Sequence, residues 1–332
     1  MRRQRATIDN MNKGRPSLEE VFSPRGVAVV GVTPPERGSY VNDVLKSLKE
    51  AGFPDGLIQS MLIGSAEVGR VIRDPRIKAV TLTGSEEAGR SVAREAGAAI
   101  KKCVLELGGS DPFIILKDAD IPTACRQAAF SRLINSGQSC ISAKRFIVVE
   151  GVFREFIEGF VSEMKVRKVG NPLDRETRVG PLAREDILQA LAKQVQKSIG
   201  LGATVLCGGK RLNRKGNFYP PTVLSGVQKG MPLFDEETFG PVAAVIKVKD
   251  EDEAIAIAND SRFGLGASLW TKDLSLAERL AAPLEAGCVF VNDIVKSDPR
   301  VPFGGTKCSG FGRELSHYGI KEFVNIKTVW VK

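Results

Sequence analysis

Along this chain, segments whose apolar residues have the spacing of a β-strand alternate with segments whose apolar residues have the spacing of an α-helix. Strands are expected at 21–32, 58–63, 79–83, 104–109, 143–150, 218–224, 242–248, 263–269, 289–292 and 323–331. Helices are expected at 40–51, 66–73, 89–100, 118–133, 153–166, 184–200, 254–260 and 274–284. The prolines in 218–224 favour an edge strand there. Strands that alternate with helices indicate an α/β fold with a doubly wound sheet.

The N-terminal part of the pattern is different. Residues 1–17 lack apolar periodicity and predict a disordered leader, with a transit peptide and an upstream start-site artefact as alternatives. Strand 21–32, loop 33–38 and helix 40–51 then form one βα unit. The N-terminus of such a helix can hold a phosphate, although the glycines here do not form a dinucleotide-binding fingerprint.

Composition narrows the class of protein. A chain of 332 residues with 42% hydrophobic and 26% charged residues is typical of a globular protein of one large or two smaller domains. Six cysteines without CxxC pairing predict free thiols in a reducing compartment, hence a cytoplasmic protein. One histidine, His317, argues against histidine-based catalysis and metal binding, so no metal site is expected. No apolar run approaches the roughly 20 residues of a membrane-spanning helix, so no membrane partner is expected.

The net charge of +9 raises the question of nucleic-acid binding. Five of the 48 basic residues lie within 1–17, and the others are scattered among acidic residues. Aromatic residues make up only 6% of the chain and are not interleaved with a basic stripe. The charge therefore indicates a solvated surface, and we expect no nucleic-acid partner.

Cys140 is the candidate nucleophile. It ends the polar, glycine-bearing turn 135–140 and precedes a predicted strand, a position where backbone N–H groups can face a reacting carbonyl. A reactive thiol there needs an electropositive setting. By spacing alone, a small buried hydrophobic residue is the competing interpretation.

Glu106 is the candidate general base. It lies inside the apolar strand 104–109, where burial raises the pKa of an unpaired carboxylate toward neutrality. The competing interpretation is a solvent-facing acid. Upstream, Gly84 and Ser85 separate a strand from a helix, a place suited to a phosphate but equally explained by helix capping.

Four motifs in a fixed order, at 105–109, 135–141, 236–241 and 302–305, resemble the aldehyde dehydrogenase superfamily, most closely its bacterial succinate-semialdehyde dehydrogenase branch. The resemblance implies an NAD or NADP cofactor and a small aldehyde substrate. It implies roles for residues at matching positions: Cys140 as nucleophile, Glu106 as activator of the deacylating water, and, for cofactor binding, Gly84, Ser85, Gly89, Leu107, Glu237 and Phe239. Phe303 lies in a loop that lines the substrate entrance in relatives.

The resemblance is continuous from Leu57 and covers roughly four-fifths of the chain. It implies an incomplete Rossmann-like cofactor domain at 18–108, an α/β catalytic domain at 109–315 and a C-terminal oligomerisation arm at 316–332. Residues 18–56 also resemble the CoA-binding domain of ADP-forming acyl-CoA synthetases. The family's Trp-Asn and Lys-Pro motifs, and the hairpin that pairs with the terminal strand, are not recognisable, so we expect a weakened homo-oligomer.

The expected function is NAD(P)-dependent oxidation of an aldehyde, with succinate semialdehyde the favoured substrate, through a Cys140 thioester. Two alternatives are a catalytically impaired remnant that acts as a binding or structural subunit, and a CoA-linked acyl-transfer enzyme. An anionic substrate tail requires an arginine. Arg132 and Arg300 are the candidates, and an ordinary salt bridge is the competing interpretation for each.

Overall fold

The computed structural model describes residues 28–29, 50, 52, 59–60 and 63–332. The predicted leader 1–17, helix 40–51 and most of strand 21–32 lie outside these residues. The chain divides into two compact units, one ending at Val80 with Val92–Lys102 added, the other formed by Thr81–Ser91 and Cys103–Lys332. The predicted domain boundary at residue 108 falls close to the second of these junctions and remains a prediction.

The first unit contains a short pair of parallel strands, one helix, and parts of two further strands and a second helix. Strands β1 (Ala28–Val29) and β2 (Gln59–Ser60) pair in parallel. Helix α4 (Ser65–Arg73) follows, and β3 (Ala79–Thr83), α5 (Glu86–Ala98) and β4 (Lys102–Glu106) each run from one unit into the other. An ion pair between Arg73 and Glu95 joins α4 to α5 within the first unit.

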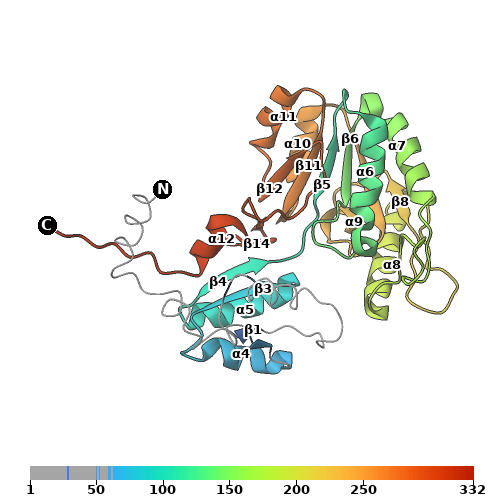
Figure 1. Ribbon diagram of the computed structural model, residues 1–332. Coiled ribbons are helices and arrows are strands. Elements are labelled where there is room, and N and C mark those ends of the chain that lie inside the picture. The colour runs from blue at the N-terminus through green and yellow to red at the C-terminus, as the bar shows by residue number, and fades with distance from the viewer. Residues whose placement is uncertain (1–27, 30–49, 51, 53–58, 61–62) are drawn as a thin grey trace. The chain divides into compact units, whose positions relative to one another are not determined.

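The second unit is built on a seven-stranded sheet in the order β12-β11-β5-β6-β9-β8-β7 (Figure 1). Its strands are β5 (Pro112–Ile115), β6 (Arg145–Val149), β7 (Thr204–Cys207), β8 (Thr222–Ser225), β9 (Val242–Val248), β11 (Gly266–Trp270) and β12 (Cys288–Val291). Neighbouring strands are parallel except β7 and β8, which are antiparallel. This arrangement confirms the predicted α/β fold.

Helices cover both faces of this sheet, which explains why its central strands are apolar throughout. Phe113 and Phe146 pack with α6 (Ile121–Leu133) and α7 (Glu150–Lys165) on one face. Ile114 and Ile147, one residue later in each strand, pack on the opposite face with α8 (Glu185–Gly200), α10 (Glu251–Asn259) and α11 (Leu274–Ala281). Alternation along each strand thus fills two separate cores.

Shorter elements complete the second unit. They are the 3₁₀ turn η1 (Ile134–Gly137), α9 (Pro232–Asp235), β10 (Phe263–Gly264), β13 (Thr306–Lys307), β14 (Gly310–Phe311) and α12 (Ser316–Glu322). Strand β14 pairs antiparallel with β4, placing Gly310 opposite Glu106. Among the described residues, no helix has the length and apolar character needed to span a bilayer.

Two predictions about strands are wrong. The strand predicted at 218–224 is not at an edge: β8 begins at Thr222, after both prolines, and lies between β9 and β7. Residues 323–331 form no strand within this chain. Strand β5 is not among the expected strands, although its residues form a short apolar run that starts with proline.

Candidate active site

Cys140 and Glu237 lie at the amino edge of the seven-stranded sheet, in the loops that lead into β6 and β9. The N–H of Lys144, just before β6, donates to the carbonyl of Asp111, just before β5 (3.0 Å). The N–H of Gly266, at the start of β11, donates to the Asp111 carboxylate (3.1 Å). Ligands in open α/β sheets usually bind at the carboxyl edge, so this site lies at the opposite end.

Cys140 follows a turn whose backbone is strained. After α6 ends, Asn135, Ser136 and Gly137 all have left-handed conformations, with φ of 49°, 57° and 79°. Two of these residues are not glycine, and such conformations persist only where neighbouring structure enforces them. One enforcing contact is the N–H of Gly180, which donates to the Ser136 hydroxyl (2.9 Å).

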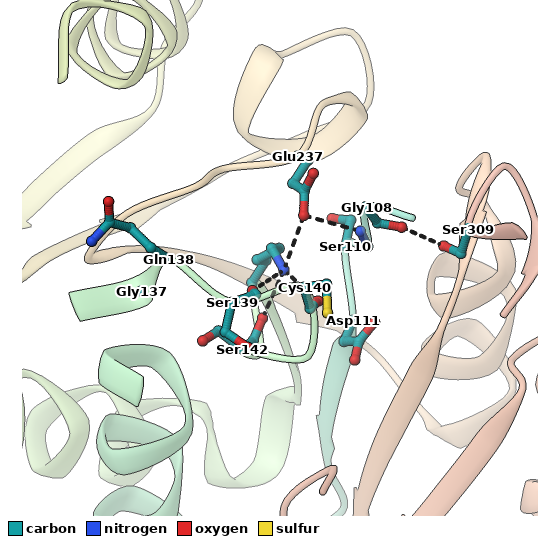
Figure 2. Close-up of polar contacts among 12 residues, drawn as sticks. Gly108, Ser110, Asp111, Gly137, Gln138, Ser139, Cys140, Ser142, Glu237 and Ser309 are labelled. Carbon is teal, nitrogen blue, oxygen red and sulfur yellow. Dashed lines mark hydrogen bonds and ion pairs between the residues drawn. The ribbon is translucent and has the colours of Figure 1, made fainter. Parts of the chain in front are cut away.

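A buried lysine holds the next part of the turn, whose residues Ser139, Cys140 and Ser142 are labelled in Figure 2. The ammonium of Lys144, a residue only 1% exposed, donates to the carbonyls of Ser139 (3.1 Å), Cys140 (2.7 Å) and Ser142 (3.1 Å). It also lies 3.7 Å from a carboxylate oxygen of Glu237, in the loop before β9. One cation therefore connects the candidate nucleophile's turn to a candidate cofactor ligand.

The surroundings of Cys140 differ from the electropositive setting that a reactive thiol requires. Burial raises the pKa of its thiol, and the carboxylates of Asp111 and Glu237 raise it further. The positive charge of Lys144 acts in the opposite direction but does not outweigh burial. The predicted electropositive setting is thus present in part, and the thiol is predominantly protonated at neutral pH.

Glu106 is buried, as the general-base interpretation requires. The residue is 3% exposed, and neither carboxylate oxygen has a hydrogen-bond partner among the described residues. Burial raises the pKa of Glu106 to about 7, helped by the nearby carboxylate of Glu314 and opposed by Arg313. A carboxyl group that titrates near neutrality can exchange a proton with water at physiological pH.

The candidate phosphate-binding residues lie at the start of α5. Gly84 donates its N–H to the carbonyl of Glu106 (3.0 Å), and the Ser85 hydroxyl accepts a backbone N–H from the helix's first turn (3.2 Å). Ser85 therefore caps the helix, which leaves its proposed contact with a phosphate untested. A Cβ at Gly89 would lie 2.6 Å from both methyl groups of Leu107, so glycine lets α5 pack closely on that side chain.

Glu237 reaches across to the loop before β5. One of its carboxylate oxygens accepts the N–H of Gly109 (3.0 Å), and a Cβ at Gly108 would lie 2.3 Å from the other. The side chain keeps 24% of its surface exposed, so it remains accessible to hydroxyl donors. Phe239, two residues later, is 36% exposed.

The two candidate arginines have unlike surroundings. Arg132 is fully buried and donates to the carbonyl of Gly137 (2.8 Å), so it supports the strained turn. Two of its side-chain nitrogens have no hydrogen-bond partner among the described residues, and its proposed contact with a substrate carboxylate remains a prediction. The side chain of Arg300 is 85% exposed and pairs with Asp298 (2.6 Å). The structure does not bring these two arginines together.

Phe303, the candidate from the substrate-entrance loop, lies near Cys140. It is 8% exposed and packs in a small apolar cluster with Leu265 and Val295, against which Cys140 also lies. The structure thus brings Phe303 and Cys140 into one apolar environment, suited to the carbon chain of a small substrate.

Lys144 and Asp111 are site residues that the sequence motifs did not single out. Asp111 is 1% exposed, one of its oxygens has no partner among the described residues, and burial raises its pKa to about 7. Each of these residues directly precedes an apolar strand, and a charged residue in that position is buried together with the strand. This was the signal in the sequence that could have identified them. The partners of these two residues, however, come from loops that are distant in sequence.

Comparison with known proteins shows the family to which this chain belongs. The sequence model of the Aldehyde dehydrogenase family matches residues 32–329, and the chain belongs to that family. The matched region therefore begins upstream of Leu57, the residue from which the resemblance in the sequence is continuous. A succinate-semialdehyde dehydrogenase [NADP(+)] 1 of Mycobacterium tuberculosis (strain H37Rv) is 50% identical over 297 residues, which are 90% of this chain and 64% of the relative.

Solved structures show the same relationship. Succinic semialdehyde dehydrogenase from Streptococcus pyogenes, in complex with NADP+, matches with a TM-score of 0.83 and 41% identity over 87% of this chain and 64% of that one. Lactaldehyde dehydrogenase from Escherichia coli matches with a TM-score of 0.82 and 33% identity over 88% and 61%. The chain spans 64% of the length of the mycobacterial relative.

Proposed function

We propose that this chain carries out NADP-dependent oxidation of succinate semialdehyde to a carboxylate, with Cys140 as nucleophile and Glu106 as general base. The observation that carries the proposal is the state of Glu106, buried, without a hydrogen-bond partner among the described residues and with a pKa of about 7. The 50% identity to mycobacterial succinate-semialdehyde dehydrogenases supports the substrate and the cofactor.

The chemistry follows from the side chains. The Cys140 thiol loses its proton, and its sulfur adds to the aldehyde carbon while backbone N–H groups stabilise the resulting oxyanion. A bound nicotinamide cofactor supplies the oxidising power by accepting a hydride. Glu106 then takes a proton from the water that hydrolyses the Cys140 thioester, which releases the carboxylate and restores the thiol.

The residues present fit a nicotinamide cofactor. The exposed part of the Glu237 carboxylate can accept hydrogen bonds from ribose hydroxyls, and Phe239 offers a partly exposed ring. Gly84 and Ser85 immediately precede a helix of 13 residues, long enough for its N-terminal dipole to favour a phosphate. Gly89 and Leu107 fix the position of that helix. NAD remains the second candidate cofactor.

The proposed substrate has an anionic tail. The apolar cluster around Phe303 suits its carbon chain, and Arg300, the exposed arginine of the two candidates, is the one able to reach a carboxylate in solution. A homo-oligomer formed through residues 316–332 and a cytoplasmic location remain predictions.

The test is formation of reduced cofactor by the purified chain from succinate semialdehyde, measured with NADP and with NAD. Cys140→Ala provides the blank, because it removes the nucleophile without adding bulk. Turnover that persists in Cys140→Ala would reject the proposed mechanism. The absence of turnover with either cofactor, while Cys140 remains reactive, would favour the impaired-subunit alternative. That alternative and the CoA-linked enzyme find no support in the relatives, which are dehydrogenases.

A further inference from the structure

Two adjacent cations, Lys144 and Arg145, are buried just before and at the start of β6, and each is 1% exposed. Each donates to three backbone carbonyls. Arg145 donates to those of Ser110 (3.0 Å), in the loop before β5, and of Ile257 and Ala258 (2.8 and 2.9 Å), in α10. Donating hydrogen bonds to backbone carbonyls is therefore a structural role that both buried cations share. A functional role for Lys144 requires contacts that Arg145 does not make.

The carbonyls bound by Lys144 distinguish it from its neighbour. All three belong to the turn 139–142, and one is the carbonyl of Cys140 itself (2.7 Å). Its ammonium also faces the Glu237 carboxylate at 3.7 Å, and that carboxylate is in turn fixed by the Gly109 N–H. Arg145 has neither connection in the described contacts.

The charged groups that act on the Cys140 thiol form a small set. Lys144 favours the thiolate, whereas Asp111 and Glu237 oppose it, and a hydrogen bond from the Ile141 N–H favours it. Lys144 in turn faces Glu237, Asp111 and Arg132. At the Cys140 thiol, Lys144 therefore opposes the effect of two carboxylates in a buried setting, where electrostatic interactions are weakly screened.

We propose that Lys144 is a positioning residue for Cys140: its ammonium fixes the turn that presents the thiol and supplies the positive charge that makes the thiol reactive, while the same ammonium holds Glu237 beside that turn. The inference rests on the proposed role of Cys140 as nucleophile. In this proposal one cation, Lys144, interacts both with the turn of the nucleophile and with the cofactor-binding carboxylate.

The test is the pH dependence of Cys140 alkylation by iodoacetamide in the full chain, followed by mass spectrometry of the Cys140 peptide. Lys144→Gln retains two N–H donors for the carbonyls but has no charge. We expect its alkylation rate at pH 7.5 to fall about tenfold, the change produced by one unit in the thiol's pKa. Lys144→Arg keeps the charge, and its rate is expected to stay within about twofold of the wild-type rate.

A second variant tests the other half of the ion pair. Glu237→Gln removes a negative charge that opposes the thiolate, so the pH midpoint of alkylation is expected to move down, opposite in direction to Lys144→Gln. Arg145→Lys controls for disturbance of buried carbonyl contacts and is expected to leave the midpoint unchanged even if the melting temperature falls. A purely structural role for Lys144 would change the melting temperature in the same way without moving the midpoint.

The outcomes separate this inference from the proposed function. A folded Lys144→Gln variant with an unchanged midpoint overturns the inference, as does an equal shift in Arg145→Lys. If Lys144→Gln does not fold, the Glu237→Gln midpoint decides: a downward shift supports the shared electrostatic setting, and no shift rejects it. A wild-type Cys140 that fails to react with iodoacetamide under any condition would instead reject the proposed nucleophile.

Discussion

Gly137 packs directly against the backbone of Gly240: a Cβ at residue 137 would lie 2.3 Å from both the carbonyl carbon and the carbonyl oxygen of residue 240. Gly137 also has a left-handed backbone, with φ of 79°. The contact joins the turn that carries Cys140 to the loop that carries Glu237. Two requirements, conformational and steric, therefore exclude any side chain at residue 137.

Gly137→Ala is expected to lower the free energy of unfolding by about 2–4 kcal/mol, because it combines left-handed strain with a clash against immobile backbone. Gly230→Ala is the matched control, since Gly230 has φ of 90° and nothing within 4 Å of the added Cβ. The control should lose only about 1 kcal/mol. Urea denaturation measures both variants, and equal losses would show that the contact with Gly240 is not the reason for the glycine.

Glu106→Gln is expected to remove turnover while raising stability at alkaline pH. The folded-state pKa of Glu106 is about 7, above its ordinary 4.5, because burial disfavours the charged form. The folded protein therefore binds this proton more tightly than the unfolded chain, and the wild type loses stability as pH rises from about 4.5 to 7. Glutamine does not titrate, so the variant should gain up to about 3 kcal/mol at pH 8 and little at pH 4.

Asp118→Asn provides the opposite case. Burial raises the pKa of Asp118, but hydrogen bonds from the Thr271 hydroxyl and the N–H groups of Lys272 and Asp273 outweigh it, so the pKa is lowered. The wild-type residue stabilises the protein above its unfolded pKa and loses this effect as pH falls. Asp118→Asn should therefore be destabilising at pH 8. A loss of stability at pH 8 in Glu106→Gln as well would contradict the buried, unpartnered state of Glu106.

The catalytic activity should follow the same Glu106 titration. Because the base must be deprotonated, the rate of thioester hydrolysis is expected to rise with pH through about 7 and to level off above it. Glu106→Gln should reduce that rate by about a hundredfold to ten-thousandfold and abolish the pH dependence. Single-turnover hydrolysis of the Cys140 thioester measures this step apart from cofactor release, and a pH profile unchanged in the variant would assign the base elsewhere.

The sequence predicts the sheet better than the site, for a physical reason. Strand β9 has the predicted bounds Val242–Val248, since an apolar run between Pro241 and charged residues can form little else. Glu106 is also recognisable locally, as an acid within an apolar strand. The function of Lys144 is not, because it depends on a carboxylate 93 residues away (237 − 144) that only the folded sheet brings within 3.7 Å. Local patterns do not record such pairings.

Cys140 is expected to react with iodoacetamide before the other five cysteines. Its side chain is only partly buried, whereas Cys125 is 3% exposed, its thiol lies 3.4 Å from the Phe156 carbonyl, and burial raises its pKa to about 12. Because burial raises the pKa of Cys140 too, its rate should increase with pH through the alkaline range. Peptide mapping after brief labelling checks the order, and faster labelling of Cys308 would contradict the choice of nucleophile.

Arg132 is expected to affect all aldehydes alike, because it acts through the turn and not through the substrate. Its buried guanidinium donates to the Gly137 carbonyl, and removing it would leave that carbonyl without this bond. Arg132→Lys should therefore lower turnover of succinate semialdehyde and of butanal by a similar factor. Steady-state kinetics with both aldehydes measures this ratio, and a loss confined to the charged substrate would restore Arg132 as a carboxylate ligand.

Arg300 is expected to distinguish the two aldehydes if it binds the anionic tail. Its guanidinium is exposed and forms a surface pair with Asp298, so it can exchange that carboxylate for one on the substrate. Arg300→Gln should raise the KM for succinate semialdehyde about tenfold, equivalent to about 1.4 kcal/mol, and leave the KM for butanal unchanged. Arg154→Gln is the matched control, because Arg154 is similarly exposed and pairs with Glu158 on α7. Equal effects of Arg300→Gln on both substrates, or none on either, would show that the Asp298 pair is its whole role.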